Sequence, residues 1–150
     1  AGLDDALVRR APSPVADVDL FRVHPAGHVE SLVDLDSAGG GRLDPDTVMG
    51  PGSWLAARLA AGAGLVAIDG LRNGDADVAF CAVRPPGHHA TPTRTMGFCL
   101  LNNVAVAAAA LADAGERVAI VDIDAHHGNG TQEAFVADGR VLFVSCHQWP

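Results

Sequence analysis

The decapeptide VDIDAHHGNG, residues 121–130, places two carboxylates and two imidazoles directly after a run of apolar residues. Side chains alternate between the two faces of a strand, so an extended chain here predicts that Asp122, Asp124 and His126 share one side. Buried carboxylates without a cation are costly, and a divalent metal removes that cost. Oxygen and nitrogen ligands without cysteine are typical of catalytic zinc, or of iron, manganese or cobalt. For Asp-x-Asp alone, capping of the next turn by Asp122 and Asp124 would be the preferred interpretation.

A second histidine pair, His88-His89, follows the rigid turn Pro85-Pro86-Gly87. Neutral imidazoles beside a metal-activated water are suitable general bases, because both groups titrate near about pH 7. Such a pair alone at a surface usually has no function, so its meaning depends on whether it meets the first group. Gly97 and Phe98 are either a turn and a core aromatic before a helix, or the lining of a narrow apolar channel.

Three apolar runs must position these residues. Residues 77–83, 117–123 and 141–145 are predicted strands, and residues 102–114 and 131–137 are predicted helices. Apolar strands that alternate with helices favour a parallel sheet covered by helices on both faces. The carboxyl ends of parallel strands lie at one edge, where ligands bind. We therefore expect five of the seven histidines to gather at that edge: His88, His89, His126, His127 and His147.

The N-terminal part of the chain is less regular. Residues 1–50 contain four prolines and the run Gly39-Gly40-Gly41, so we expect mostly loops there, with a short helix only around residues 29–35. Ser53 is then predicted to cap a helix whose apolar side chains lie on one broad side.

Composition limits the class of protein. With 150 residues and 49% hydrophobic content, the chain has enough apolar surface for one core and one domain. A net charge of −8 without any lysine excludes a basic patch for direct nucleic-acid binding. The longest uncharged apolar run, residues 104–112, is too short for a bilayer, so we expect a soluble, cytoplasmic protein without a membrane partner. The three cysteines lack a disulfide spacing and are predicted to be reduced core thiols.

Three motifs, RPPGHHA, GFCLLNNVAVAA and VDIDAHHGNGTQ, in this order and spacing resemble the zinc-dependent histone deacetylase family, which includes acetylpolyamine amidohydrolases and acetoin-utilisation proteins. A weaker likeness in VHPAGHVESL, LDPDTVMGPGSW and VSCHQWP extends the resemblance over nearly the whole chain. It implies the arginase/deacetylase fold, an α/β/α three-layer parallel sheet that is incomplete in residues 1–150. It also implies a hydrolase that removes acetyl groups from acetylated lysine or acetylpolyamine, and it leaves oligomerisation open.

Carried over position by position, the resemblance makes Asp124 and His126 ligands of a catalytic zinc ion. It makes His89 the general base that activates the attacking water. His88 becomes its electrostatic neighbour, which helps to protonate the leaving amine. Asp122 is implied to form a hydrogen bond with His88.

The resemblance also implies residues around this centre. Asn129 stands where other members have Asp, as in the class II-like branch, and a neutral partner leaves His89 less basic. A structural monovalent cation such as K+ is implied beside Asp122, Asp124, His126 and the region of Ser145.

Substrate contacts are implied at two places. Gly97 and Phe98 would line the acyl-lysine tunnel, and either Asp46 or Asp44 would be the rim acid that holds the substrate backbone. The third zinc ligand of the family, an Asp, and its Tyr that stabilises the transition state lie further downstream. This chain contains no Tyr, so we expect it to be the N-terminal portion of a catalytic domain.

Two alternatives stay open at this point. The same fold includes ureohydrolases with two manganese ions, which need an Asp-x-His-x-Asp arrangement, whereas position 128 is Gly. The chain could also be a truncated, non-catalytic fragment that binds metal weakly or not at all.

Overall fold

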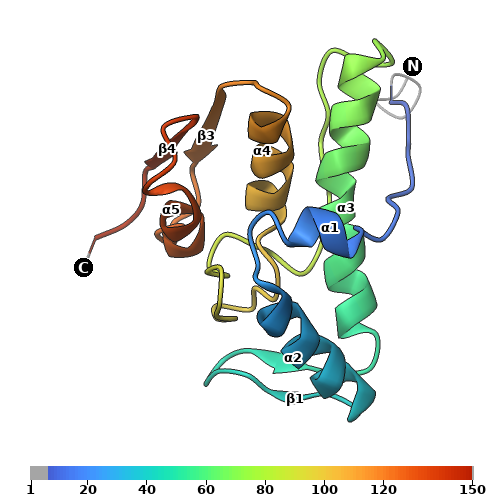
Figure 1. The fold of residues 1–150 in the computed structure, drawn as a ribbon, viewed down its shortest axis with the longest axis vertical. Coiled ribbons are helices and arrows are strands. Elements are labelled where there is room, and N and C mark those ends of the chain that lie inside the picture. Colours follow the sequence, from blue (N-terminus) through green and yellow to red (C-terminus); the bar gives the residue numbers. More distant parts are fainter. Residues whose placement is uncertain (1–6, 150) are drawn as a thin grey trace.

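The computed structural model describes residues 7–149. Helices α3 and α4 form its centre, with α2 and a short hairpin at one end and a parallel pair of strands beside α4 (Figure 1). In chain order the elements are α1 (Asp17–Leu20), α2 (Ala26–Ser37), β1 (Gly41–Arg42), β2 (Val48–Met49), α3 (Ser53–Arg72), α4 (Asn103–Asp113), β3 (Val118–Asp122), α5 (Asn129–Phe135) and β4 (Val141–Ser145).

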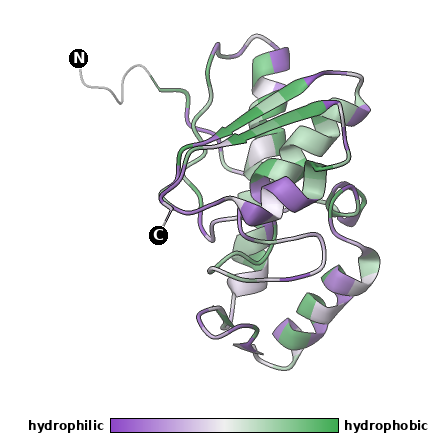
Figure 2. Cartoon of the chain, turned by 90° about the vertical axis from the view of Figure 1, so that its left-hand side faces the viewer, coloured by the Kyte–Doolittle hydropathy of each residue, from purple (hydrophilic) through white to green (hydrophobic). Residues whose placement is uncertain are grey.

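Strands β3 and β4 form the predicted parallel pair, in a register that sets Asp122 beside Ser145 at the carboxyl end. One face of the pair packs on α4 and α5, where Ile120 is 8% and Val141 is 7% exposed. The opposite face is also apolar, and Figure 2 shows these strands coloured as hydrophobic in front of the helices. The described residues therefore supply two layers of the three-layer α/β/α fold. We call the exposed side the uncovered strand face; it consists of Ala119, Val121, Leu142 and Val144.

Helix α3 begins at Ser53, one residue earlier than predicted, because Gly52 is the N-cap; Ser53 does not cap the helix, and its hydroxyl instead accepts from the N–H of Gly50. Within residues 7–149 it is the one helix that is long and apolar enough, by length and composition, to cross a membrane, although the longest uncharged run did not indicate this. Trp54 and Ala57 on α3 belong to the first hydrophobic core, and the helix packs along α4. Arg58, in the same stretch, donates a hydrogen bond to the carbonyl of Val15. Packing inside the protein accounts for one side of α3, since 39% of its apolar stretch is buried and Leu55 and Leu71 are exposed.

Residues 77–83 do not form the strand that was predicted. The segment is irregular, and Val78 and Phe80 are 82% and 92% exposed. A strand is stabilised by backbone hydrogen bonds to a neighbouring strand, which an apolar run cannot supply by itself. Cys81 lies in this segment and is exposed, as is Cys146 after β4, so only Cys99 is a core thiol. All three cysteines are free.

The region around α2 is more regular than predicted. Helix α2 takes 12 residues where mostly loops were expected. Pro25 directly precedes the helix, and Gly39 and Gly40 follow it with φ angles of 92° and 97°. These are positions that proline and glycine favour around a helix. The residues that suggested loops therefore mark the two ends of α2.

His24, in the turn before α2, is completely buried. Its Nδ1 lies 3.1 Å from the carbonyl oxygen of Pro92, and its Nε2 lies 2.9 Å from the backbone nitrogen of Asn102. A carbonyl can only accept and an N–H can only donate, so the ring carries its proton on Nδ1 and a lone pair on Nε2. Burial, together with repulsion from His28, lowers the pKa of His24 to about 4.

We expect acid to destabilise the protein through this histidine. The unfolded chain binds the proton with a pKa of about 6.5, whereas the folded ring resists it. The contribution of His24 is complete above about pH 6.5 and is lost as the pH falls towards about 4, with a total of about 3 kcal/mol. The pKa of His28, whose ring lies 5.2 Å away, is also lowered by burial and adds to the effect. Urea unfolding at several pH values should show a weaker acid loss for His24→Gln, and an unchanged pH dependence would contradict this assignment.

Candidate active site

The loop after residue 83 brings His88 and His89 to the carboxyl end of β3. Nδ1 of His88 lies 2.8 Å from Oδ2 of Asp122, and the two side chains are only 17% and 13% exposed. Because a carboxylate accepts hydrogen bonds, His88 donates from Nδ1 and its ring orientation is fixed by Asp122. The ring centroids of His88 and His89 are 4.0 Å apart. The contact between His88 and Asp122 that the family resemblance implied is present.

His89 is oriented by the start of α5. Its Nδ1 lies 2.8 Å from Oδ1 of Asn129, while Nδ2 of the same amide points to the sulfur of Met96 at 3.5 Å. The amide oxygen can only accept, so His89 carries its proton on Nδ1 and presents the lone pair of Nε2. A neutral imidazole with a free Nε2 lone pair is the form that a general base requires.

Asp124 and His126 meet through a turn and not through a strand. Strand β3 ends at Asp122, and one carboxylate oxygen of Asp122 accepts from the N–H of Asp124 at 3.1 Å. Oδ1 of Asp124 in turn accepts from the N–H of His126 at 2.7 Å. The prediction that the chain stays extended up to residue 126 is therefore wrong, because the two carboxylates cap successive turns after the strand has ended. The backbone N–H of His126, followed by its side chain, lowers the pKa of Asp124.

The side chains of Asp124 and His126 carry atoms that could bind a zinc ion. Oδ1 of Asp124 and Nδ1 of His126 are 3.0 Å apart, and their side chains are 49% and 78% exposed. Tetrahedral zinc with bonds of about 2.0–2.1 Å separates two ligand atoms by about 3.3 Å, so a small adjustment suffices. Within residues 7–149, however, no three His, Cys, Asp or Glu side chains form a metal-binding group. Asp124 and His126 are thus a pair of candidate ligands, and the described residues bring no third such side chain to them.

A tight turn at residues 96–99 lies against His89. The backbones of Met96 and Cys99 bond to each other, and the two central residues, Gly97 and Phe98, are left-handed with φ angles of 56° and 63°. A Cβ on Gly97 would lie 2.4 Å from Cδ2 of His89, so no side chain fits there. The Phe98 side chain is 60% exposed. The sequence alternative of a core aromatic at position 98 is therefore wrong.

In the whole protein, the change Gly97→Ala is expected to reduce kcat of any reaction in which His89 is the base by about 100-fold. The reason is that a new methyl group must push the His89 ring from its place. The left-handed backbone adds strain to the turn. Gly27→Ala, in α2, is the matched control, since a Cβ there meets nothing within 4 Å. Measured kcat values should differ sharply between the two variants, and equal values would contradict the role given to this contact.

The hairpin of β1 and β2 places Asp46 next to the same turn. Oγ1 of Thr47 donates to Oδ1 of Asp46 at 2.9 Å and accepts from the N–H of Phe98 at 3.0 Å. The hydrogen bond from Thr47 lowers the pKa of Asp46, and the N–H of Gly97 contributes in the same direction. Asp44 instead accepts from the N–H of Asp46 inside the hairpin. Of the two candidate rim acids, Asp46 is the one beside the Gly97–Phe98 turn.

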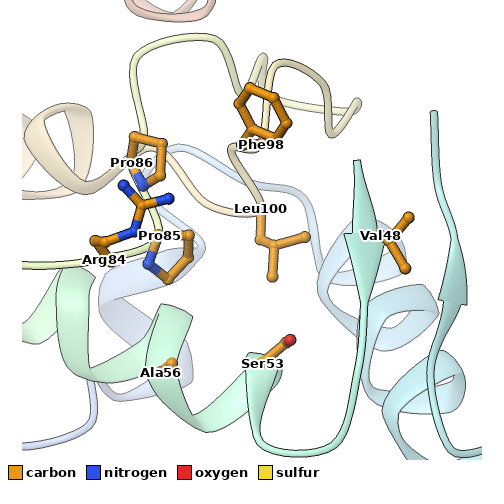
Figure 3. A pocket seen from close by; sticks show the side chains of 8 residues that line it. All are labelled: Val48, Ser53, Ala56, Arg84, Pro85, Pro86, Phe98 and Leu100. Carbon is orange, nitrogen blue, oxygen red and sulfur yellow. The ribbon is translucent and has the colours of Figure 1, made fainter. Parts of the chain in front are cut away.

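Two hollows adjoin these residues. One, of about 280 Å³, is lined by His88, Asp122 and Asp124, together with the turn before His88 and the first two residues of α4. The second, of about 300 Å³, lies between β2, α3 and the Arg84-Pro85-Pro86 segment, with Phe98 at its rim (Figure 3). His88, Asp122 and the candidate ligand Asp124 therefore face open space, whereas His89 and His126 line neither of these two hollows.

The sequence matches the histone deacetylase domain family over residues 1–150. The chain belongs to the histone deacetylase family. It is 47% identical over 150 residues to a histone deacetylase-like amidohydrolase of Pseudomonas aeruginosa, with 99% of this chain and 40% of that protein covered. A probable deacetylase of Archaeoglobus fulgidus is 44% identical, with 97% and 41% covered.

A solved structure supports the arginase/deacetylase fold of this histone deacetylase family member. The crystal structure of the HDA15 HD domain matches with a TM-score of 0.87 and 40% identity over 92% of this chain and 39% of that one. The chain therefore spans about 40% of the length of the relatives that it matches.

The predicted histidine cluster is divided into two parts in the structure. His88, His89 and His126 lie together, with 6.0 Å between the ring centroids of His89 and His126. His127 and His147 form a separate pair with centroids 4.6 Å apart. Ser145, implied to lie by the monovalent cation, has its hydroxyl 2.9 Å from Nδ1 of His147, and the cation stays a prediction. Thr47, Met96 and His24 were not found from the sequence, because only tertiary contacts connect them to the site.

Proposed function

We propose that the whole protein is a zinc-dependent amide hydrolase that removes acetyl groups from acetylated lysine or acetylpolyamine. The observation that carries this proposal is the hydrogen bond from Nδ1 of His89 to Oδ1 of Asn129, which leaves Nε2 available, beside the adjacent side chains of Asp124 and His126. Membership of the deacetylase family and the named relatives support the reaction class.

Each residue of the site has a part in this reaction. A zinc ion held by Asp124 and His126 would polarise the acyl carbonyl. His89 accepts the proton of the attacking water at Nε2. His88, whose Nδ1–H is held by Asp122, stabilises charge beside it and helps to deliver a proton to the leaving amine.

The substrate is positioned by the turn and the hairpin. Gly97 and Phe98 would flank the acyl-lysine chain, and the carboxylate of Asp46 would accept an N–H of the substrate backbone. A ureohydrolase is disfavoured, because a Cβ at Gly128 would lie 2.2 Å from Oδ2 of Asp122 and leave no room for a third carboxylate. The net charge of −8 supports our view that the protein does not bind nucleic acid directly. Separately, we propose a cytoplasmic location for it.

The test is hydrolysis of an acetyl-lysine peptide and of an acetylated polyamine by the whole protein, with zinc present and after chelation. Turnover that is lost on chelation and restored by zinc supports the proposal, and the preferred substrate shows which class is used. No turnover of either compound would refute it. The 150-residue chain, assayed in parallel, should be inert because it supplies only two candidate zinc ligands among its described residues and contains no Tyr. Activity of that chain similar to the whole protein would show that its site is complete.

A further inference from the structure

Both ends of the loop that carries the 96–99 turn are held by one side chain. His24 donates from Nδ1 to the carbonyl of Pro92 and accepts at Nε2 from the backbone N–H of Asn102. Residues 92–102 lie between these two contacts, and their central turn touches His89. Because His24 has no exposed surface, water cannot easily replace either hydrogen bond.

Asn102 extends this connection to the other side of His89. Its Nδ2 donates to the carbonyl of Ala90 at 3.0 Å and to Oγ1 of Thr131 at 3.2 Å. Ala90 directly follows His89 in the chain, and Thr131 lies in α5, which begins with the His89 partner Asn129. Ala90, Asn102 and Thr131 are all completely buried. A shift of Asn102 would therefore move both segments that orient the candidate base.

We propose that His24 is a positioning residue for catalysis, which fixes the 92–102 loop and the His89 segment relative to each other through Pro92 and Asn102. His24 does not touch the reacting groups, and the inference rests on the proposed function. An apolar side chain at position 24 would fill the volume but leave a buried N–H and a buried carbonyl without partners. The loop would then move to satisfy these groups, and the turn would no longer be pressed against His89.

Two substitutions separate shape from hydrogen bonding. In His24→Gln, the amide oxygen can accept from the N–H of Asn102 where Nε2 does now. In His24→Leu, neither hydrogen bond can form, although the apolar bulk is kept. Val141→Ala, at the start of β4, is the matched control, because it removes a side chain from the core between the two parallel strands, α4 and α5 without touching the 92–102 loop.

The first measurement is steady-state kinetics of the whole protein on an acetyl-lysine peptide, at equal zinc content and below the melting temperature of each variant. His24→Leu should lower kcat by about 100-fold, His24→Gln should recover at least about tenfold of that loss, and Val141→Ala should keep the wild-type kcat. A wild-type kcat in His24→Leu would overturn the proposal, as would a loss that His24→Gln does not recover.

The second measurement, amide hydrogen exchange of residues 92–102, does not depend on turnover. Exchange there should be faster by about tenfold or more in His24→Leu, and α3 should exchange as in the wild type. Equal exchange of the loop in both proteins would overturn the positioning role. If the wild-type protein hydrolyses no acetyl amide while the loop responds as expected, the proposed function fails and the structural role of His24 remains.

Discussion

His89→Ala in the whole protein is expected to lower kcat for an acetyl-lysine substrate by about 100- to 10,000-fold, the usual contribution of a general base. The change removes the lone pair that Asn129 orients and leaves Asp124 and His126 in place. Zinc content, measured on the same samples, should therefore equal that of the wild type. The combination of lost turnover and retained metal distinguishes a base from a ligand.

His127→Ala is the control for this variant. His127 is also a histidine of the 121–130 segment, but its Nε2 contacts Gln132 and its ring lies beside His147, away from His89. Its substitution should change kcat little. If His89→Ala and His127→Ala had the same activity, the base would have to be sought elsewhere.

Asp124→Ala and His126→Ala are each expected to remove bound zinc from the whole protein and, with it, measurable turnover. Substitution of a residue behind a metal ligand typically weakens binding by about 10- to 100-fold, so loss of a ligand itself should weaken it by more than about 100-fold. The loss should be larger for Asp124, because its carboxylate also accepts from the backbone N–H of His126 and holds the turn.

Metal analysis after dialysis against a weak chelator checks this expectation. Asp138→Ala serves as the control, since Asp138 is a surface carboxylate that pairs with Arg140 away from the site. Full zinc stoichiometry in both Asp124→Ala and His126→Ala would show that the metal is bound by other residues.

Apolar runs and capping residues in the sequence predicted the positions of β3, β4, α4 and α5 to within about two residues. Strand β4 has the predicted bounds, β3 differs by one residue at each end, and α4 begins after Asn102, whose side chain caps it. Helix α5 begins at Asn129, two residues before the predicted start. The strand at 77–83 was wrong, because strand formation depends on a distant partner.

The site was predicted in part for a reason that the structure does not support. Asp124 and His126 are close to each other, but side-chain hydrogen bonds of the turn bring them together and strand alternation does not. Thr47 and Phe98, which are in contact, are separated by 51 positions in the sequence, and His24 and Asn102 by 78. No periodicity or motif within one segment could have indicated such pairs.

The uncovered strand face has the apolar composition of a buried surface, although the described residues leave it exposed. A sheet with one side in water usually alternates apolar and polar side chains, whereas β3 and β4 are apolar on both sides. Replacing Val121 or Leu142, each 63% exposed, by a polar residue would cost the present fold almost nothing. An apolar face of this kind suits the third layer of the α/β/α fold, so we expect the same polar substitutions to be costly wherever a helical layer covers β3 and β4.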